Sequence, residues 1–386
     1  MEITHKKLGL ADVFRQFEEL YYQQHTLCPD QHKAYQSILH CRSMAMVMHL
    51  STCDQCGYQQ TCYNSCRNRH CPQCQYTKQL IWVEKLKNKL LPVRYFHIVL
   101  TIPEFLNPLF YINQRDCYHL LFKASAVAME KVTSNPFFLG AQSGHVSVLH
   151  TWGQNLSYHP HIHMLVPAGG MDPDGMQWIH SPKRFFVPVK ALSKIFRGVF
   201  MDLLKKVMQE GQLRVPEREQ ALYADFAAVK ARAYFSSWNV HIKKTFGGAN
   251  QVVSYLGRYT HRVAITNNRL LSMDQHQIRF RWKDYRDNQT KVMTLEGLCF
   301  IRRFLQHILP SGFYKIRYYG LFASVNSNTK MKQCFALLGL AAPEPVFKTL
   351  SAGEILLLIT DIGHSLCPAC GKGVMQWKMI LPAAPE

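Results

Sequence analysis

The sequence predicts an α+β fold in which a small helical, cysteine-rich domain precedes an antiparallel sheet with helices packed on it. Helical apolar spacing over residues 8–22 and 31–48 leads into a dense group of cysteines at 53–74. Later β-branched and aromatic runs are short enough for strands and are separated by longer helical stretches. Neighbouring strand patterns at 146–152 and 161–166 favour antiparallel pairing of adjacent strands.

Size and charge point to a folded protein with a polyanionic partner. The chain has 386 residues, which predicts two or three domains, and its 47% hydrophobic content supports a sizeable core. Lys and Arg number 45 against 25 Asp and Glu, giving a net charge of +20. These positive charges are spread along the chain, so we expect basic surfaces on folded elements that face nucleic acid.

Whether the cysteines form disulfides depends on the cellular compartment, and two apolar features of the sequence help to predict it. Residues after Met1 are polar and then amphipathic, unlike a signal peptide, and the apolar run 355–359 is too short to cross a bilayer. We therefore expect a cytoplasmic protein with no membrane partner. In a reducing compartment its 13 cysteines are expected to be thiolate ligands or buried thiols rather than disulfides.

Three domains follow from the pattern: 1–90, 91–325 and 326–386. The first ends after a Lys-rich helix at 75–90, which is stopped near Pro92. In the second, strands are predicted at 95–102, 146–152, 161–166 and 239–244, and helices at 114–133, 189–209, 216–232 and 250–259. A strand at 277–283 and a helix at 295–309 complete it, and the pattern loosens after 325 into a tail beyond a linker at 341–345.

Two Cys-x2-Cys pairs, each at a turn, lie fourteen residues apart in the first domain. Cys53, Cys56, Cys71 and Cys74 can together provide the four thiolates that a structural zinc requires. A second zinc would need four of five other nearby candidates, which are Cys41, His49, Cys62, Cys66 and His70. We expect one or two Zn²⁺ ions to stabilise this domain, because a small loop-rich module has little core of its own.

A further Cys-x2-Cys pair lies near the end of the chain. Cys367 and Cys370 provide only half of a zinc site, with His364 nearby. Such a half-site would have to be completed by another residue or by another chain.

The string His159-Pro-His-Ile-His163 can contribute to a second kind of metal site. In a strand, residues two apart share a face, so His161 and His163 are predicted to project together. Two imidazoles make most of a three-ligand site. Gln154, His150 and His159 are all candidates for the third ligand, with Gln154 slightly favoured because its side chain offers a carbonyl oxygen.

The string Tyr255-Leu-Gly-Arg-Tyr259 places two phenols on one face of a predicted helix, four residues apart. A phenol with a pKa near 10 is a poor nucleophile, so a reacting tyrosine needs a polarised phosphate or nearby cations. Taken alone, such a pair on a helix indicates core packing more often than chemistry. Basic residues expected to contact DNA are Arg258, Arg262, Lys243, Lys244, Arg67, Arg69 and, on one face of the strand 277–283, Arg279 and Arg281.

Taken together, the strings resemble the HUH superfamily of single-strand DNA endonucleases, and within it the transposases of rolling-circle insertion sequences, the IS91-like family and its common-region relatives. The matching segments run in order from about residue 28 to 322. They include Tyr63–Gln75, Leu149–Leu156, His159–Gly170, Phe246–Gly248, Tyr255–Ile265 and Phe300–Leu305.

The resemblance implies a ferredoxin-like HUH palm, with the His strand central in an antiparallel sheet, behind a zinc-binding DNA module. It implies Mg²⁺ or Mn²⁺ at His161 and His163, and Tyr255 and Tyr259 as nucleophiles. Each nick would leave a 5′-phosphotyrosine and a free 3′-hydroxyl on single-stranded DNA at element ends and target sites. Host replication machinery is an expected partner, in a nucleoid-associated, bacterial-type setting. No nucleotide cofactor is expected, because the chain has no Gly-x4-Gly-Lys-Ser/Thr loop.

Two other functions remain open at this level. A plasmid replication initiator or a relaxase would use the same chemistry, although the leading zinc module and the lack of a helicase domain disfavour a relaxase. A non-catalytic zinc-finger regulator would leave the His and Tyr strings structural.

Overall fold

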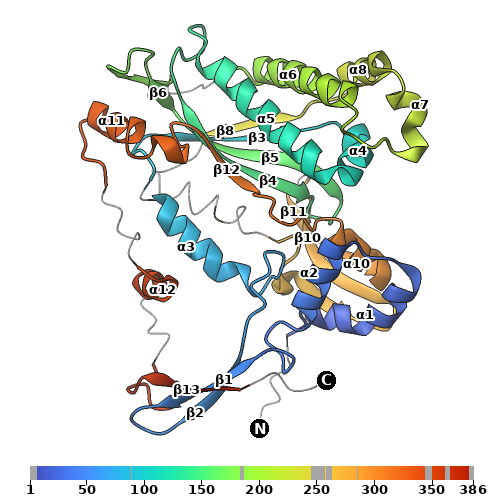
Figure 1. Ribbon diagram of the computed structural model, residues 1–386, viewed down its shortest axis with the longest axis vertical. Helices are drawn as coiled ribbons and strands as arrows, with labels where there is room; N and C mark the ends of the chain where they lie inside the picture. The colour runs from blue at the N-terminus through green and yellow to red at the C-terminus, as the bar shows by residue number, and fades with distance from the viewer. Residues whose placement is uncertain are drawn as a thin grey trace.

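The protein is elongated, with a sheet-and-helix body at one end and a small three-stranded sheet at the other (Figure 1). The computed structural model describes residues 7–87, 89–182, 187–244, 257, 263–284, 286–343, 350–360 and 366–381. Within these ranges, no helix has both the length and the apolar composition to span a bilayer.

A five-stranded antiparallel sheet forms the body, in the order β12-β4-β5-β3-β8. The central strand β5 is paired on one side with β4 and on the other with β3. The predicted central position of the His strand is therefore confirmed. The strands are β3 (Tyr95–Thr101), β4 (Gly144–Trp152), β5 (Tyr158–Pro167), β8 (Val240–Lys244) and β12 (Ile316–Gly320).

One face of this sheet is closed by helices. Alternation along β5 directs Ile162, Met164 and Val166 to this face, where they join a large apolar core. The covering helices are α4 (Asn107–Ile112), α5 (Gln114–Thr133), α6 (Val189–Gln209), α7 (Gln220–Tyr223) and α8 (Phe226–Phe235) (Figure 1). Long apolar side chains such as Phe196 and Phe200 of α6 are fully buried there. This packing fixes the strands that carry the histidines.

Among the described residues, the opposite face is covered only at one end. Leu165 and Val146 pack there with Val83 and Leu86 of α3 (Gln75–Lys87), and α11 (Lys330–Leu337) joins the same cluster. The short hairpin of β6 (Gly169–Met171) and β7 (Trp178–His180) adds Met171 and Trp178 to it. Toward the start of β5 this face carries polar side chains, which are described below.

The N-terminal helices share a core with a distant part of the chain. Phe14 lies in α1 (Leu10–Gln24) and stacks on Tyr35 of α2 (Pro29–Leu39), with ring centroids 4.2 Å apart. Its ring also contacts Phe304 edge-on, with centroids 5.6 Å apart. Phe304 belongs to α10 (Gly297–Leu305), which packs with the sheet β9 (Leu270–Met273), β10 (Gln277–Asp284) and β11 (Gln289–Glu296). The hydrophobic cores therefore do not divide at residue 90, because residues 264–308 complete the core of α1 and α2.

The tail also returns to the N-terminal region. β13 (Met375–Leu381) pairs antiparallel with β1 (Met48–Cys53), which pairs with β2 (Gln59–Tyr63), so the sheet order is β13-β1-β2. The preceding helix α12 (Ala352–Thr360) contacts α3. None of these three strands was predicted, and the pairing of β13 with β1 joins residues more than 300 apart, which leaves no local signature in the sequence.

Most predicted helices and strands are present with similar bounds. The helix predicted at 31–48 ends at Leu39, and β1 begins at Met48. The predicted helix 216–232 is divided into short segments around α7 and α8. The helix predicted at 250–259 lies outside the described residues except for Gly257.

Candidate active site

Three histidines converge on the open face of the central sheet. His161 and His163 project from β5, and His150 of β4 is the direct ladder partner of His161. Each offers a ring nitrogen, and these nitrogens lie within 4.8 Å of one another. His150 and His163 are buried, and His161 is partly exposed. The group is therefore compact and accessible from one side.

The hydrogen bonds of these rings favour a cation between them. His161 Nδ1 lies 2.6 Å from the backbone oxygen of His159, so this nitrogen carries the proton and donates it. His161 Nε2 then presents a lone pair to His163 Nε2, 3.0 Å away. Two imidazole nitrogens at this distance repel if both present lone pairs, and a shared metal ion removes that repulsion. The donor set thus fits a divalent metal.

Burial keeps the imidazoles in the form that binds metal. Removal from water and, to a smaller extent, the neighbouring His159 imidazole together lower the pKa of His161 to about 3. A histidine with so low a pKa is neutral at pH 7, as a metal ligand must be.

His150 is the third histidine that the structure brings together with His161 and His163, whereas Gln154 was favoured from the sequence. Gln154 lies beyond the end of β4, where its backbone oxygen accepts a hydrogen bond from Arg269. His159 also lies outside the group of converging nitrogens. Gln154 was favoured for the carbonyl oxygen of its side chain, whereas strand register decides that His150 lies opposite His161.

His97 of β3 is a neighbour of the site that sequence reasoning missed. Its Nε2 lies 2.8 Å from His163 Nδ1, and the two rings stack with centroids 5.0 Å apart. His163 can donate its Nδ1 proton to His97, which leaves His163 Nε2 free to bind metal. The available signal was a histidine inside the mostly apolar run 95–102. Only the pairing of β3 with β5 shows that this histidine lies near His163.

Tyr255 and Tyr259 lie outside the described residues, as do Arg258 and Arg262. Gly257, between the two tyrosines, is buried against α3: a Cβ there would lie 2.3 Å from Val83 Cγ2. Because Val83 packs on the same sheet face as the histidines, Gly257 lies against the helix that covers part of that face.

A four-cysteine group lies at the base of α3. Cys41, Cys66, Cys71 and Cys74 bring their sulfurs together, with separations of 3.5 Å (Cys41–Cys74), 3.6 Å (Cys66–Cys74) and 3.7 Å (Cys41–Cys71). Four sulfurs each ~2.3 Å from one zinc would lie about 3.8 Å apart. Hydrogen bonds from neighbouring thiols, Cys66 foremost, lower the pKa of Cys41 to about 7, which favours thiolate. The group therefore fits a tetrahedral zinc site.

The prediction that Cys53, Cys56, Cys71 and Cys74 share one ion is wrong. The two pairs belong to different groups, and Cys53 and Cys56 lie beside Cys367 and Cys370 instead. The strands β1 and β2 carry the first pair away from the second. The repeated pattern Cys-x2-Cys-Gly at Cys53 and at Cys367 was the signal that these two pairs match.

Three other zinc candidates belong to neither group. His70 Nε2 accepts a hydrogen bond from the backbone N–H of Leu309 at 3.2 Å, so this ring connects the cysteine loop to the segment after α10. His49 and Cys62 face each other across the β1–β2 ladder. None of the three is among the residues that converge in the described part of the chain.

The basic residues predicted to contact DNA divide into two kinds. Arg69 is structural: its guanidinium donates to the carbonyl oxygens of Leu309, Pro310 and Phe313. Three of the five guanidinium donors are therefore used within the protein, and the contact of Arg69 with DNA stays a prediction. Arg67 is exposed, with its backbone oxygen accepting from Lys78.

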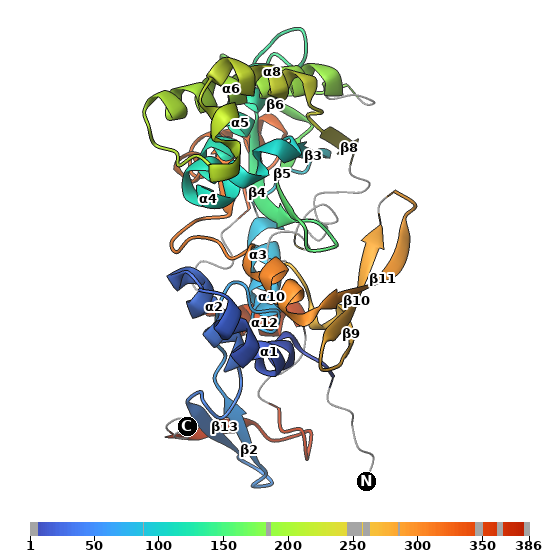
Figure 2. The same ribbon diagram turned by 90° about the vertical axis from the view of Figure 1, so that its right-hand side faces the viewer.

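Arg279 and Arg281 lie on the exposed face of β10, and Phe280 between them is buried. The predicted alternation of this strand is confirmed. Figure 2 shows β10 and β11 extending as an arm beside α10. Lys243 of β8 lies opposite His97 in the ladder, on the histidine face, and Lys244 is the next residue of the same strand.

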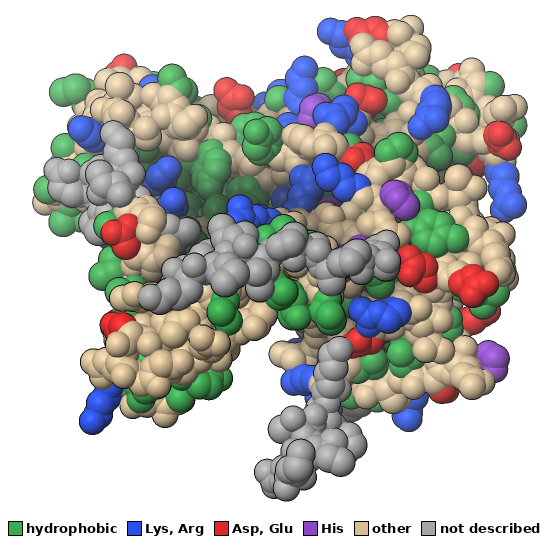
Figure 3. All heavy atoms as spheres, turned by 60° about the horizontal axis from the view of Figure 1, so that its bottom comes forward, with side chains coloured by type: hydrophobic (Ala, Val, Ile, Leu, Met, Phe, Trp, Pro, Cys, Tyr) green, Lys and Arg blue, Asp and Glu red, His purple; other side chains and the backbone are tan. Residues whose placement is uncertain are grey.

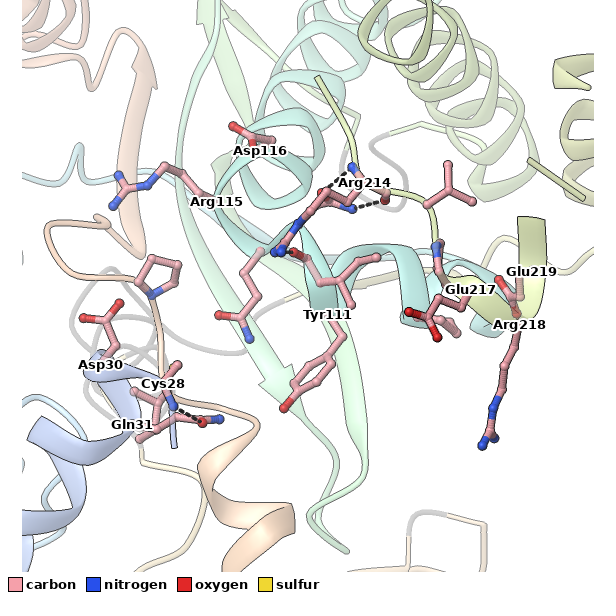
Figure 4. A pocket seen from close by; sticks show the side chains of 18 of the residues that line it. Cys28, Asp30, Gln31, Tyr111, Arg115, Asp116, Arg214, Glu217, Arg218 and Glu219 are labelled. Carbon is pink, nitrogen blue, oxygen red and sulfur yellow. Dashed lines mark hydrogen bonds between the residues drawn. The ribbon is translucent and has the colours of Figure 1, made fainter. Parts of the chain in front are cut away.

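A large cavity lies elsewhere, between α2, the start of α5 and residues 212–219, with a volume of about 1290 Å³. Its lining carries both signs of charge, including Asp30, Arg115, Asp116, Arg214 and Glu217 (Figure 4). None of the predicted site residues lines it. The cavity is therefore separate from the histidine group.

Comparison with known proteins decides the family. Residues 13–102 match the family model described as "Transposase zinc-binding domain", and residues 144–330 match the one described as "Putative transposase". A putative transposase, y4qJ, from Sinorhizobium fredii is 43% identical over 380 residues, covering 95% of this chain and 94% of the relative. The chain belongs to the IS91-like transposase family.

A more distant relative agrees with this family. The transposase for insertion sequence element IS801 of Pseudomonas savastanoi pv. phaseolicola is 28% identical to the present transposase over 310 residues, which cover 80% of this chain and 73% of the relative. No solved structure matches the transposase. Its five-stranded sheet agrees with an HUH palm, and the resemblance seen in the sequence is confirmed.

Proposed function

We propose that this transposase nicks and rejoins single-stranded DNA through a tyrosine nucleophile and a divalent metal ion. The observation that carries the proposal is the convergence of His150, His161 and His163 on the open face of the central sheet. Gly257, flanked by Tyr255 and Tyr259, packs on the helix that covers the adjoining part of this face. Metal ligands and nucleophile would thus face one scissile phosphate.

In the proposed cleavage step, a tyrosine of the protein replaces the 3′-oxygen of the DNA strand on phosphorus. A bound Mg²⁺ or Mn²⁺ would draw charge from a non-bridging phosphate oxygen. The Oη of Tyr255 or Tyr259 attacks phosphorus, a P–O bond to the tyrosine forms, and the bond from phosphorus to the 3′-oxygen breaks. The phenolic proton is lost, and the departing 3′-oxygen gains one. One ester replaces another, so neither ATP nor another energy source is needed.

Rejoining reverses these bonds. A free 3′-hydroxyl attacks the 5′-phosphotyrosine, which restores the phosphodiester and the tyrosine. A second tyrosine lets one site hold a second strand, which suits rolling-circle movement of an element in step with host replication.

Exposed basic side chains support the proposal that the protein holds a DNA strand. Lys243 lies on the histidine face, and Arg279 and Arg281 are exposed on the β9–β11 arm. Figure 3 shows Lys and Arg side chains around a hollow near the centre of one face. Phosphate contacts of this kind give affinity without sequence preference.

The decisive test is covalent capture of DNA. The full-length transposase is incubated with Mn²⁺ and single-stranded oligonucleotides carrying element ends, and adducts are resolved by denaturing electrophoresis. Wild type is expected to form an adduct, and the double variant Tyr255→Phe/Tyr259→Phe is expected to form none. The single variants show which tyrosine attacks first.

Two controls make the result specific. Tyr234→Phe removes a phenol from α8, on the helical side of the sheet, and should leave adduct formation unchanged. His161→Ala should abolish the adduct while DNA binding persists. An adduct that survives in the double Phe variant, or its absence from wild type on every end tested, would overturn the proposal.

A further inference from the structure

The two ends of the chain meet in a second four-cysteine group. Cys53 Sγ lies 3.8 Å from Cys370 Sγ, and Cys56 Sγ lies 3.6 Å from Cys367 Sγ. Sulfurs around one zinc ion are expected to lie about 3.8 Å apart, and these separations are close to that distance. We infer that this group binds a second zinc ion, in a ribbon built jointly from the N-terminal hairpin and the C-terminal segment.

The two halves of the site are alike in conformation. Each is a Cys-x2-Cys-Gly turn, and the glycines Gly57 and Gly371 adopt φ values of 70° and 65°. The amide of Cys56 donates to Cys53 Sγ at 3.5 Å, and the amide of Gly373 donates to Cys370 Sγ at 3.3 Å. Amide donation to sulfur favours thiolate, the form that binds zinc.

Backbone pairing holds the halves in place. Cys53 lies opposite Met375 in the β1–β13 ladder. Beside it, the amide of Val374 donates to Asp54 Oδ1 at 2.7 Å, and the amide of Asp54 donates to the oxygen of Val374 at 3.1 Å. Gly373 packs so closely that a Cβ there would lie 2.4 Å from Cys53 Sγ. This approach brings the second pair of sulfurs to the first.

Only half of this site lies in the matched zinc-binding domain, which includes Cys53 and Cys56. That match ends at residue 102, whereas Cys367 and Cys370 are near the end of the chain. The other group, Cys41, Cys66, Cys71 and Cys74, lies entirely within that match. The second zinc ion therefore joins the matched domain to a C-terminal segment outside it.

The second zinc ion acts as a clasp, which here means that it holds the C-terminal segment against the N-terminal sheet. β13 covers one edge of β1, and α12 contacts α3 (Figure 1). α3 in turn packs against Gly257. Because small ribbons draw their stability from the metal, the zinc ion keeps β13 on β1 and α12 beside α3.

Zinc content of the full-length protein tests the site directly. Wild type is expected to hold about two zinc ions per chain, and Cys367→Ser/Cys370→Ser about one. The matched control Cys28→Ser/Cys299→Ser, which alters cysteines outside both groups, should keep about two. One zinc per wild-type chain, or two in the Cys367→Ser/Cys370→Ser variant, would overturn the inference.

Hydrogen exchange tests the clasp and does not depend on DNA cleavage. Loss of the second zinc should accelerate exchange of the amides of Met48–Cys53, with little change in the sheet around β5. If the cysteine variant does not fold, a chelator is applied to wild type. Cys56 is exposed, so this site should release its zinc before the more buried group of Cys41 and Cys74. Unchanged exchange in Met48–Cys53 after that first release would contradict the clasp.

Discussion

At the scale of single residues, the site depends on which imidazole nitrogen carries the proton. His161 is oriented by the backbone oxygen of His159, and His163 by His97. Each partner leaves an Nε2 available for a metal ion. The neighbours of the ligands therefore contribute to metal affinity as the ligands do.

Replacing His97 should weaken metal binding without removing a ligand. We expect His97→Leu to raise the Kd for Mn²⁺ about 10–100-fold, because His163 loses the partner of its Nδ1 proton. His97→Gln offers an acceptor oxygen and should restore part of the affinity. Mn²⁺ binding is measured by calorimetry and by Mn²⁺ titration of adduct formation. His119→Gln, on α5, is the control, and equal affinities in all variants would refute the role of His97.

Gly257 should be intolerant of any side chain. In Gly257→Ala the new Cβ would collide with Val83 Cγ2, so the segment between the two tyrosines must shift from α3. We expect adduct formation to fall at least about tenfold, since small misplacements of reacting groups are costly. The double change Gly257→Ala/Val83→Ala removes the collision and should recover activity, and failure to recover would show that space at Val83 is not the reason.

At the scale of elements, the β9–β11 arm combines a buried face with a basic one. Ile278 and Phe280 enter the core shared with α1 and α10, and Arg279 and Arg281 face solvent. Asp284, buried at the end of β10, pairs with Arg286 and Lys291 at 2.9 Å each. Those pairs lower the pKa of Asp284 and stabilise the turn that joins β10 to β11.

The exposed arginines of this arm should contribute to DNA affinity. We expect Arg279→Ala/Arg281→Ala to weaken binding of single-stranded DNA and to reduce the salt slope by about 1.4, at ~0.7 for each phosphate that the variant no longer neutralises. Fluorescence anisotropy at several salt concentrations measures both. Lys205→Ala/Lys206→Ala on α6 removes equal charge from the helical side and is the control. If both variants change the salt dependence of DNA binding equally, the exposed arginines of this arm have no specific role in binding DNA.

At the scale of the whole molecule, buried neutral histidines make stability depend on pH. Burial lowers the pKa of His145 and of His307 to about 3 from the usual 6.5. The unfolded chain takes up these protons below about pH 6.5 and the folded chain does not. This stabilisation is complete above 6.5 and is lost as the pH falls toward 3.

Thermal unfolding should therefore show a lower Tm at pH 5.5 than at 7.5, with zinc content checked at both. Each such histidine contributes up to about 1.4 kcal/mol per pH unit in this range. His307→Gln keeps polar atoms near Thr151 and Leu156, its partners, but cannot be protonated. Its Tm should vary less with pH, and an unchanged pH dependence would exclude His307 as a contributor.

The sequence alone determined the features that depend on local spacing. Alternation predicted β5 and placed His161 and His163 on one face, and Cys-x2-Cys turns identified the zinc-binding residue types. The same local reasoning predicted the exposed arginines of β10. Such patterns are visible because side-chain direction repeats every two residues in a strand.

Only the tertiary structure decided which residues meet. Strand register placed His150 opposite His161 and His97 beside His163, where the sequence favoured Gln154. Pairing of β1 with β13 assigned Cys53 and Cys56 to the far end of the chain instead of to Cys71 and Cys74. The physical reason is the same in each case: backbone pairing between distant segments sets these contacts, and residue spacing carries no record of it.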